Sequence, residues 1–294
     1  MLHVVIADKK MSLYEDLYSP ALTLGTLVSL NVPCLVSRLP RDSPLGSLQR
    51  LGFPFNMTNN TLDRHFSFSA KNIKEGRYHT CLTCMFNHVG LGHFNGNMVF
   101  LLASGYDLHI QYGRKHLLLG FFGGGVSGCI SQFSLYLYQQ IKWENILPSP
   151  KSWSFLGHTL TIHLTRWQKS ALGNIFTRVN AWRPCIGCSA GLAGLLAIQA
   201  CSNIVELIRQ SRKTGIKMDF NLLYRLSQLS FTSLVLFEDI YVLAGSAMWE
   251  KNMLSNLIAY SVDGVGHAAH LGGFIFGFFY YFLVIYNRVT PREF

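Results

Sequence analysis

Long apolar stretches, interrupted by single polar residues, recur six times along this chain. A helix rises 1.5 Å per residue, so about 20 residues cross the roughly 30 Å hydrocarbon core of a bilayer. Six stretches meet that length: Leu17–Val36, Cys81–Gly105, His116–Gln139, Pro184–Leu207, Asn221–Ala247 and Val262–Tyr286. The pattern predicts an all-α, polytopic membrane protein with a bundle of six transmembrane helices.

Two long polar connectors separate these stretches. Ser37–Thr80 and Ile141–Arg183 contain many of the proline, asparagine and basic residues and show no sustained apolar period. We expect both to be extramembrane loops with short helices at the membrane surface. The membrane domain then occupies residues 17–287, with long loops at about 37–80 and 141–183, between short tails at 1–16 and 288–294.

The short loops predict the orientation, because basic residues in short loops favour the cytosolic or matrix side. The loop after the fifth predicted helix contains a single basic residue, Lys251, whereas the loops after the second and fourth predicted helices contain more basic residues. Their basic residues are Arg114, Lys115, Arg209, Arg212, Lys213 and Lys217. Both termini therefore share that side, and the two long connectors lie on the opposite side.

Composition supports a lipid environment. Hydrophobic residues make up 49% of the 294 residues and charged residues only 14%, against about 25% in soluble domains. The net charge of +10 comes from scattered basic residues. An anionic membrane surface explains such scattered charge better than nucleic acid does. A soluble enzyme and a nucleic-acid-binding protein are both disfavoured.

Several polar side chains lie inside the predicted helices, where an ionisable group costs about 2.5–3.5 kcal/mol on insertion scales. His93 and Asn97 are four residues apart in the second helix and share one face. Ser189 lies in the first turns of the fourth, where unpaired backbone N–H groups favour negative charge. Glu238 and Asp239 in the fifth are expected near its outer end, pairing with donors from a loop.

The sixth predicted helix contains His267 and His270. A serine becomes a nucleophile when a histidine accepts its proton, and the resulting oxyanion needs hydrogen-bond donors. Ser189 and His270 can form the first pair. The donors can come from His93, Asn97 and the Ser189 amide, since the predicted topology brings all these groups to one face of the membrane.

Three segments resemble one known family. The segment "EGRYHTCLTCMFNHVGLGHFNGNM" within Phe66–Gly105 resembles the second-helix region of rhomboid intramembrane serine proteases. The sequence "GCSAG" is similar to their Gly-x-Ser motif and "HAAHLGGFIFG" to their sixth helix. The loop before the second helix and the HAAH sequence look most like the mitochondrial branch. The chain departs from the pattern at Ala190, where the family usually has glycine.

The resemblance implies a serine endopeptidase that cleaves transmembrane protein substrates in a lipid bilayer. It implies Ser189 as nucleophile and His270 as general base, with His93 and Asn97 in the oxyanion hole. Structural or supporting roles remain for Gly187, His88, His267, Gly273 and Gly277. No cofactor and no metal are implied.

Other interpretations of the same residues remain open. Gly187-x-Ser189-x-Gly191 also matches the nucleophile elbow of soluble α/β-hydrolases, although that elbow needs a preceding strand. Ser189 taken alone could simply ease helix packing. For the whole protein, the main alternative is a catalytically silent rhomboid-like protein that binds transmembrane clients for quality control. A transporter comes third, because no internal repeat supports it.

A metal site is a further alternative. His88, His93, His267 and His270 could converge on a metal, but zinc sites usually add a carboxylate or thiolate and no HExxH sequence is present. The pairs Cys81-x-x-Cys84 and Cys185-x-x-Cys188 are separated by about a hundred residues, where a zinc ribbon has about 15–20. Small core residues explain them better, and a disulfide or redox role stays open.

The cellular compartment is predicted from the N-terminal residues, the family resemblance and two glycosylation sequons. Residues 1–10 lack the apolar core of a signal peptide, and an Arg- and Ser-rich transit peptide is also missing. The resemblance favours the mitochondrial inner membrane. Asn56-Met57-Thr58 and Asn59-Asn60-Thr61 are glycosylation sequons in the first long loop, which keep the Golgi or plasma membrane as the alternative.

Overall fold

The computed structural model describes residues 2–146, 151–155, 158–162, 184–215, 218–248 and 266–287. The expectations for the start of the sixth helix at residues 262–265, for Lys251, for most of the second connector and for the C-terminal tail lie outside these residues.

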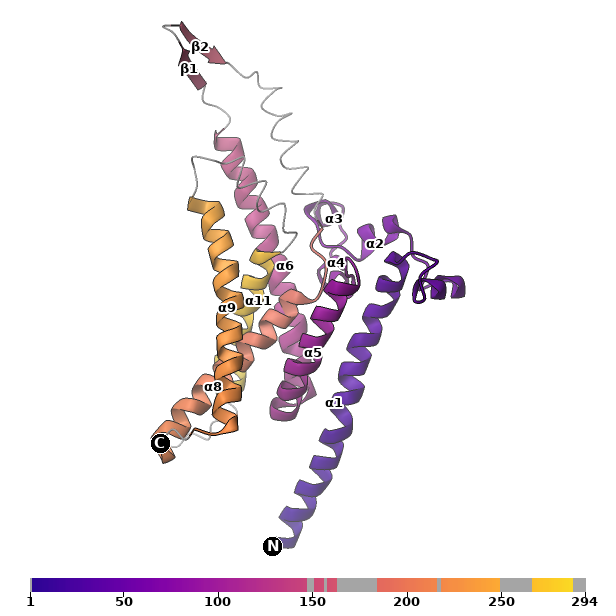
Figure 1. The fold of residues 1–294 in the computed structure, drawn as a ribbon, viewed down its shortest axis with the longest axis vertical. Helices are drawn as coiled ribbons and strands as arrows, with labels where there is room; N and C mark the ends of the chain where they lie inside the picture. The colour runs from indigo at the N-terminus through magenta and orange to yellow at the C-terminus, as the bar shows by residue number, and fades with distance from the viewer. Residues whose placement is uncertain are drawn as a thin grey trace.

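The described chain is a helical bundle (Figure 1). Its long helices are α1 (Leu2–Arg38), α5 (Leu91–Tyr112), α6 (Arg114–Ile146), α8 (Ser189–Thr214), α9 (Phe220–Met248) and α11 (His267–Tyr280), the last continued by the π-helical turn η4 (Tyr281–Tyr286). Helix α11 packs against both α6 and α8, while α9 lies against α8 and α11 and α1 lies against α5. The all-α polytopic fold is as predicted.

Five helical segments within the described residues are long and apolar enough to cross a membrane. They are Pro20–Arg38, Arg114–Tyr138, Ser189–Lys213, Phe220–Leu243 and His267–Tyr286. Each overlaps a predicted helix, and the apolar part of α1 begins at Pro20 although the helix itself begins at Leu2. The remaining predicted helix corresponds to α5, whose 22 residues extend about 33 Å but include more polar positions.

The predicted start of that second membrane helix at Cys81 is wrong. Residues from Thr80 form two short pieces, α4 (Thr80–Thr83) and η2 (Cys84–Phe86). The backbone is then extended at Asn87 and at Gly90, and α5 begins only at Leu91. The apolar run from Cys81 to Phe86 therefore forms separate short pieces, the first of which packs on α6, and it is not part of α5.

The first connector contains short helices, as expected. They are η1 (Gly46–Leu51), α2 (Asn59–His65), α3 (Ala70–Lys74) and α4. The Thr58 and Ser69 side chains cap α2 and α3 by accepting from backbone N–H groups. Asn72 Nδ2 ties the two together by donating to the Asp63 and Ser67 carbonyls at 2.9 and 2.6 Å.

The described part of the second connector differs from the expectation of short helices. Helix α6 continues to Ile146, and an antiparallel hairpin follows, formed by β1 (Lys151–Phe155) and β2 (His158–Ile162). Trp153 lies opposite Leu160 in this hairpin. Apolar side chains alternate with serine and threonine in both strands, which is the period of a β-strand.

Glycines bring the central helices into close contact. A Cβ at Gly273 on α11 would lie 2.1 Å from the Ala190 carbonyl oxygen, and one at Gly277 would lie 2.2 Å from the Gly194 carbonyl oxygen on α8. On α6, a Cβ at Gly128 would lie 2.5 Å from the Ala190 Cβ. Only glycine permits these approaches, and the small-residue face of α11 thus sets its distance from α8.

Polar side chains attach α9 to the bundle. Asp107 on α5 accepts hydrogen bonds from Gln199 on α8 at 3.0 Å and from Gln228 on α9 at 3.1 Å, and Tyr224 donates to the same carboxylate. The surface of α9 is otherwise largely exposed, including its large apolar side chains Leu234, Phe237 and Tyr241. These contacts and the packing on α11 hold α9 in place.

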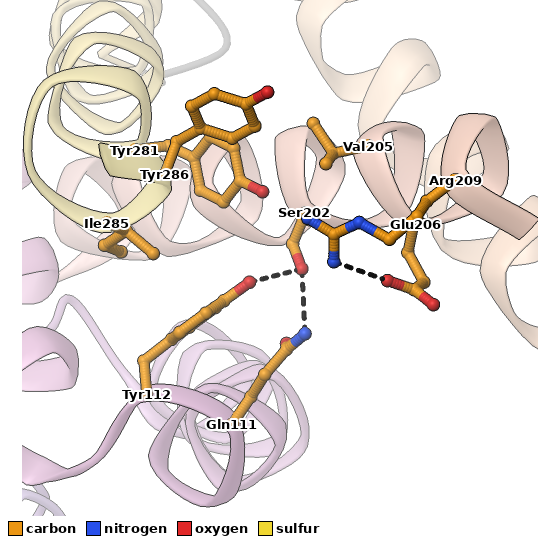
Figure 2. Close-up of a pocket in the computed structure, with 9 residues that line it drawn as sticks. All are labelled: Gln111, Tyr112, Ser202, Val205, Glu206, Arg209, Tyr281, Ile285 and Tyr286. Carbon is orange, nitrogen blue, oxygen red and sulfur yellow. Dashed lines mark hydrogen bonds and ion pairs between the residues drawn. The ribbon is translucent and has the colours of Figure 1, made fainter. Parts of the chain in front are cut away.

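A pocket with polar and apolar lining lies between the C-terminal end of α5, the second half of α8 and η4 (Figure 2). Ser202 lies at its centre and accepts a hydrogen bond from Gln111 Nε2 at 2.9 Å, while Arg209 and Glu206 form an ion pair beside it. Ser202 is 13 residues after Ser189 on α8, which is about 20 Å along the helix. The pocket is therefore remote from Ser189.

Candidate active site

Ser189 is the first residue of α8, and the turn before it is tightly fixed. Phe68 and Cys185 exchange two backbone hydrogen bonds of 3.0 and 2.8 Å, and the Gly187 N–H donates to the Cys84 carbonyl at 2.9 Å. Gly187 has φ +103°, a conformation that side chains with a Cβ rarely adopt. A Cβ there would also lie 2.7 Å from His93 Cε1, so this turn requires glycine.

The Ser189 hydroxyl meets a histidine from the neighbouring helix. Ser189 Oγ lies 2.8 Å from His270 Nε2, although the two residues are 81 positions apart in sequence. His270 lies in the first turn of α11, one turn before Gly273, whose contact with Ala190 brings the two helices together. A serine hydrogen-bonded to an imidazole has the arrangement of an activated nucleophile.

His93 and Asn97 lie on the first turns of α5, on the side that faces Gly187. A Cβ at Gly187 would be 3.0 Å from His93 Nε2 and 3.5 Å from Asn97 Nδ2, so both nitrogens lie beside the turn that carries Ser189. Asn97 is 9% exposed, and its Nδ2 has no hydrogen-bond partner among the described residues. A buried donor without a partner at this place is available to a substrate oxygen.

His88 lies behind His93. It is fully buried, and its ring meets that of His93 edge to face with centroids 5.0 Å apart. Its Nε2 lies 3.7 Å from Cys188 Sγ, next to the nucleophile turn. His88 therefore supports the His93 ring and the turn, and it has no contact with Ser189 Oγ in the described structure.

Asp239 is a member of the site that the sequence analysis did not place there. It was expected to pair with loop donors, but its Oδ1 lies 3.1 Å from His270 Nδ1 and 2.7 Å from His267 Nδ1. Asp239 is 2% exposed, whereas the adjacent Glu238 is exposed. Asp239 is seven residues after the buried Thr232 and shares its inward face, but the sequence alone contains no signal that distinguishes it from Glu238.

Ala190, the departure from the family pattern, has a packing role. It is 8% exposed and fits against Gly128 of α6 and Gly273 of α11. The extra methyl group thus fills space between helices α6, α8 and α11.

The two cysteine pairs are neighbours in one core cluster. Cys84 Sγ lies 3.7 Å from the Sγ of Cys129 on α6, and Cys188 Sγ faces His88. All seven cysteines are free thiols. Within the described residues, no group of three or more histidine, cysteine or acidic side chains could hold a metal ion.

A bundle of apolar helices, in which a serine at the start of α8 is hydrogen-bonded to a histidine in the first turn of α11, defines a multi-pass membrane protein. A family model described as the Rhomboid domain matches residues 75–287, which is more than half of the chain. The chain belongs to the rhomboid family, as its sequence motifs predicted.

Curated relatives are distant. The chain is 33% identical over 66 residues to RHOMBOID-like protein 12, mitochondrial, of Arabidopsis thaliana, covering 22% of this chain and 20% of that protein. It is 30% identical over 87 residues to Rhomboid-like protein 16, chloroplastic, of the same plant, covering 29% of this chain and 27% of that protein. The matched part thus spans less than a third of either relative. No solved structure matches the chain.

Proposed function

We propose that this protein is an intramembrane serine endopeptidase that cleaves transmembrane protein substrates. The observation that carries the proposal is the 2.8 Å hydrogen bond between Ser189 Oγ and His270 Nε2. Both residues lie at the ends of apolar helices, which supports a reaction at the membrane and not in bulk water.

The first half-reaction forms an acyl-enzyme. Ser189 Oγ attacks the carbonyl carbon of the scissile peptide bond while its proton moves to His270 Nε2, and the carbonyl π electrons move to the oxygen. When this intermediate collapses, the C–N bond breaks and His270 gives its proton to the leaving amine. Ser189 is then esterified with the amino-terminal part of the substrate.

The second half-reaction uses water. His270 removes a proton from a water molecule as it attacks the ester carbon, and the returned proton restores the Ser189 hydroxyl. The products are a new carboxylate and the free enzyme.

The negative oxygen of both intermediates needs preorganised donors. Asn97 Nδ2 and His93 Nε2 flank the Gly187 turn, and the first backbone N–H groups of α8 have no partner inside their helix. We assign His93 and Asn97 to this role. Gly187, Gly273 and Gly277 hold the geometry by close packing, and His88 and His267 support the side chains that act.

We expect transmembrane segments as substrates because the helices around the site expose much apolar surface. An apolar substrate helix can pack on that surface, whereas a soluble polar peptide remains in water. Phe231, Leu234 and Phe237 on α9 are all exposed in the structure and suit contact with lipid or with a substrate helix. The proposal requires no cofactor.

We place the protein in an organelle membrane, with the mitochondrial inner membrane favoured. Support comes from the HAAH sequence and from the names of the two relatives, one mitochondrial and one chloroplastic. The alternative of the Golgi or plasma membrane is tested through the sequons below.

The direct test is cleavage of a model transmembrane substrate by the purified full chain in proteoliposomes. Wild-type protein should release two fragments, and Ser189→Ala should release none. Ser233→Ala is the matched control, because Ser233 is an exposed serine on α9 and should leave cleavage unchanged. Binding of the substrate without cleavage by the wild type would instead support the catalytically silent client-binding protein.

A further inference from the structure

A carboxylate on α9 extends the hydrogen-bond chain that begins at Ser189. Asp239 Oδ1 lies 3.1 Å from His270 Nδ1, while the other ring nitrogen, Nε2, lies 2.8 Å from Ser189 Oγ. The three side chains come from three different helices, α8, α9 and α11. The Asp239 side chain is 3% exposed, so bulk water does not compete for these bonds.

This contact determines which ring nitrogen of neutral His270 carries the proton. An ionised carboxylate can only accept hydrogen bonds, so His270 Nδ1 must donate to it. Nε2 is then unprotonated and can accept the proton of Ser189. In the opposite tautomer Nε2 would itself carry hydrogen, and the serine could not be activated.

His267 holds the same carboxylate from another direction. Its Nδ1 lies 2.7 Å from Asp239 Oδ1, and its side chain is 2% exposed. Two N–H donors on one oxygen stabilise the ionised form of Asp239 and fix its rotamer. His267 and His270 are three residues apart, so they lie on adjacent parts of one helical face and can share this acceptor.

Proton transfer adds an electrostatic contribution. When the Ser189 proton reaches Nε2, His270 becomes an imidazolium cation next to the buried carboxylate. Opposite charges at this separation attract more strongly in a poorly solvated site than in water. The tetrahedral intermediate, in which that cation exists, gains more from Asp239 than the resting enzyme does.

We propose that Asp239 is a positioning residue for His270, so that the site works as a serine–histidine–aspartate arrangement built across three membrane helices. This inference rests on the proposed protease function. It also makes activity depend on the packing of α9 against α11, because the carboxylate belongs to α9.

The test measures the labelling kinetics of the full chain in detergent with a fluorophosphonate probe, together with kcat and KM for a transmembrane substrate. Asp239→Asn should lower the labelling rate constant and kcat by on the order of 10⁴-fold with little change in KM, the loss typical of neutralising the orienting carboxylate of a serine protease. Asp239→Glu, which keeps the charge, should recover part of that loss. Glu238→Gln is the matched control and should label at the wild-type rate.

The outcomes separate the possible failures. If Asp239 only supports the fold, Asp239→Asn will lower the fraction of protein that can be labelled, and the rate constant of the remainder will stay at the wild-type value. That result overturns the role of Asp239 alone. If Asp239→Asn does not fold, Asp239→Ala decides: labelling of its folded fraction at the wild-type rate contradicts the proposal, and labelling of that fraction at a reduced rate supports it. A wild-type protein that is not labelled overturns the protease function itself and this inference with it.

Discussion

The contact between α8 and α11 gives a prediction whose size follows from the structure. A methyl group added at Gly273 would lie 2.1 Å from the Ala190 carbonyl oxygen, whereas van der Waals contact needs about 3.5 Å. In Gly273→Ala the two helices must therefore separate locally by roughly 1 Å. His270 is one turn away on the same helix, so its distance to Ser189 should increase from 2.8 Å beyond hydrogen-bond range.

A displacement of about 1 Å of a catalytic group can cost on the order of 10²-fold in rate. We expect a loss of that size in the fluorophosphonate labelling rate of Gly273→Ala, with a stability cost of about 1–3 kcal/mol from overpacking. Labelling kinetics and thermal unfolding in detergent, measured on the same preparation, separate the two effects.

Two other glycines serve as controls. Gly277→Ala meets the Gly194 carbonyl at 2.2 Å but lies one turn further from His270, so it should lose similar stability and less activity. Gly25 on α1 has no atom within 4 Å of an added Cβ, and Gly25→Ala should change neither. Folded Gly273→Ala that is labelled at the wild-type rate would refute the argument that this glycine sets the Ser189–His270 distance.

Three further predictions concern the site and the topology. Ser189→Ala and His270→Ala should each abolish cleavage by the folded protein, and the double variant should be no worse than either, because the two groups act as a unit; additive losses would contradict this. Asn97→Ala should reduce turnover by on the order of 10²–10³-fold while Ser189 is still labelled by the probe; unchanged turnover would remove Asn97 from the oxyanion site. The exposed sequon residues Asn56 and Asn59 should carry no glycan in the native protein, and glycosidase treatment should cause no mobility shift; a shift that is lost when both are changed to glutamine would move the protein to the secretory pathway.

The residues that the structure gathers around Ser189 were largely predictable from the sequence. His93, Asn97 and His270 belong to motifs within single helices, and the spacing of a motif fixes the side of the helix on which its residues lie. The packing of α11 on α8 was predictable as well, because Gly273 and Gly277 form a face of small residues.

Asp239 was not predictable in the same way. Its role depends on the rotation of α9 about its own axis, which is set by contacts with α11 and by the Asp107 hydrogen bonds with Gln228 and Tyr224. Nothing in the sequence indicated which of the adjacent residues Glu238 and Asp239 faces the site. Only packing shows that Asp239 faces inward and Glu238 faces outward.

Local backbone conformation explains the other differences. The start of α5 at Leu91 depends on the extended backbone at Asn87 and Gly90, although the apolar composition continues across this break. In the second connector, the alternation around Trp153 and Leu160 has the period of a strand, and it is too short to be apparent within a long polar segment.

We propose above all that Ser189 is the nucleophile of a membrane-embedded protease. Mass spectrometry of the full chain after reaction with a fluorophosphonate probe tests it most directly. We expect one covalent adduct, on Ser189, which is absent when His270 is changed to alanine. An adduct located only on other residues, or no adduct on a folded protein, would contradict it.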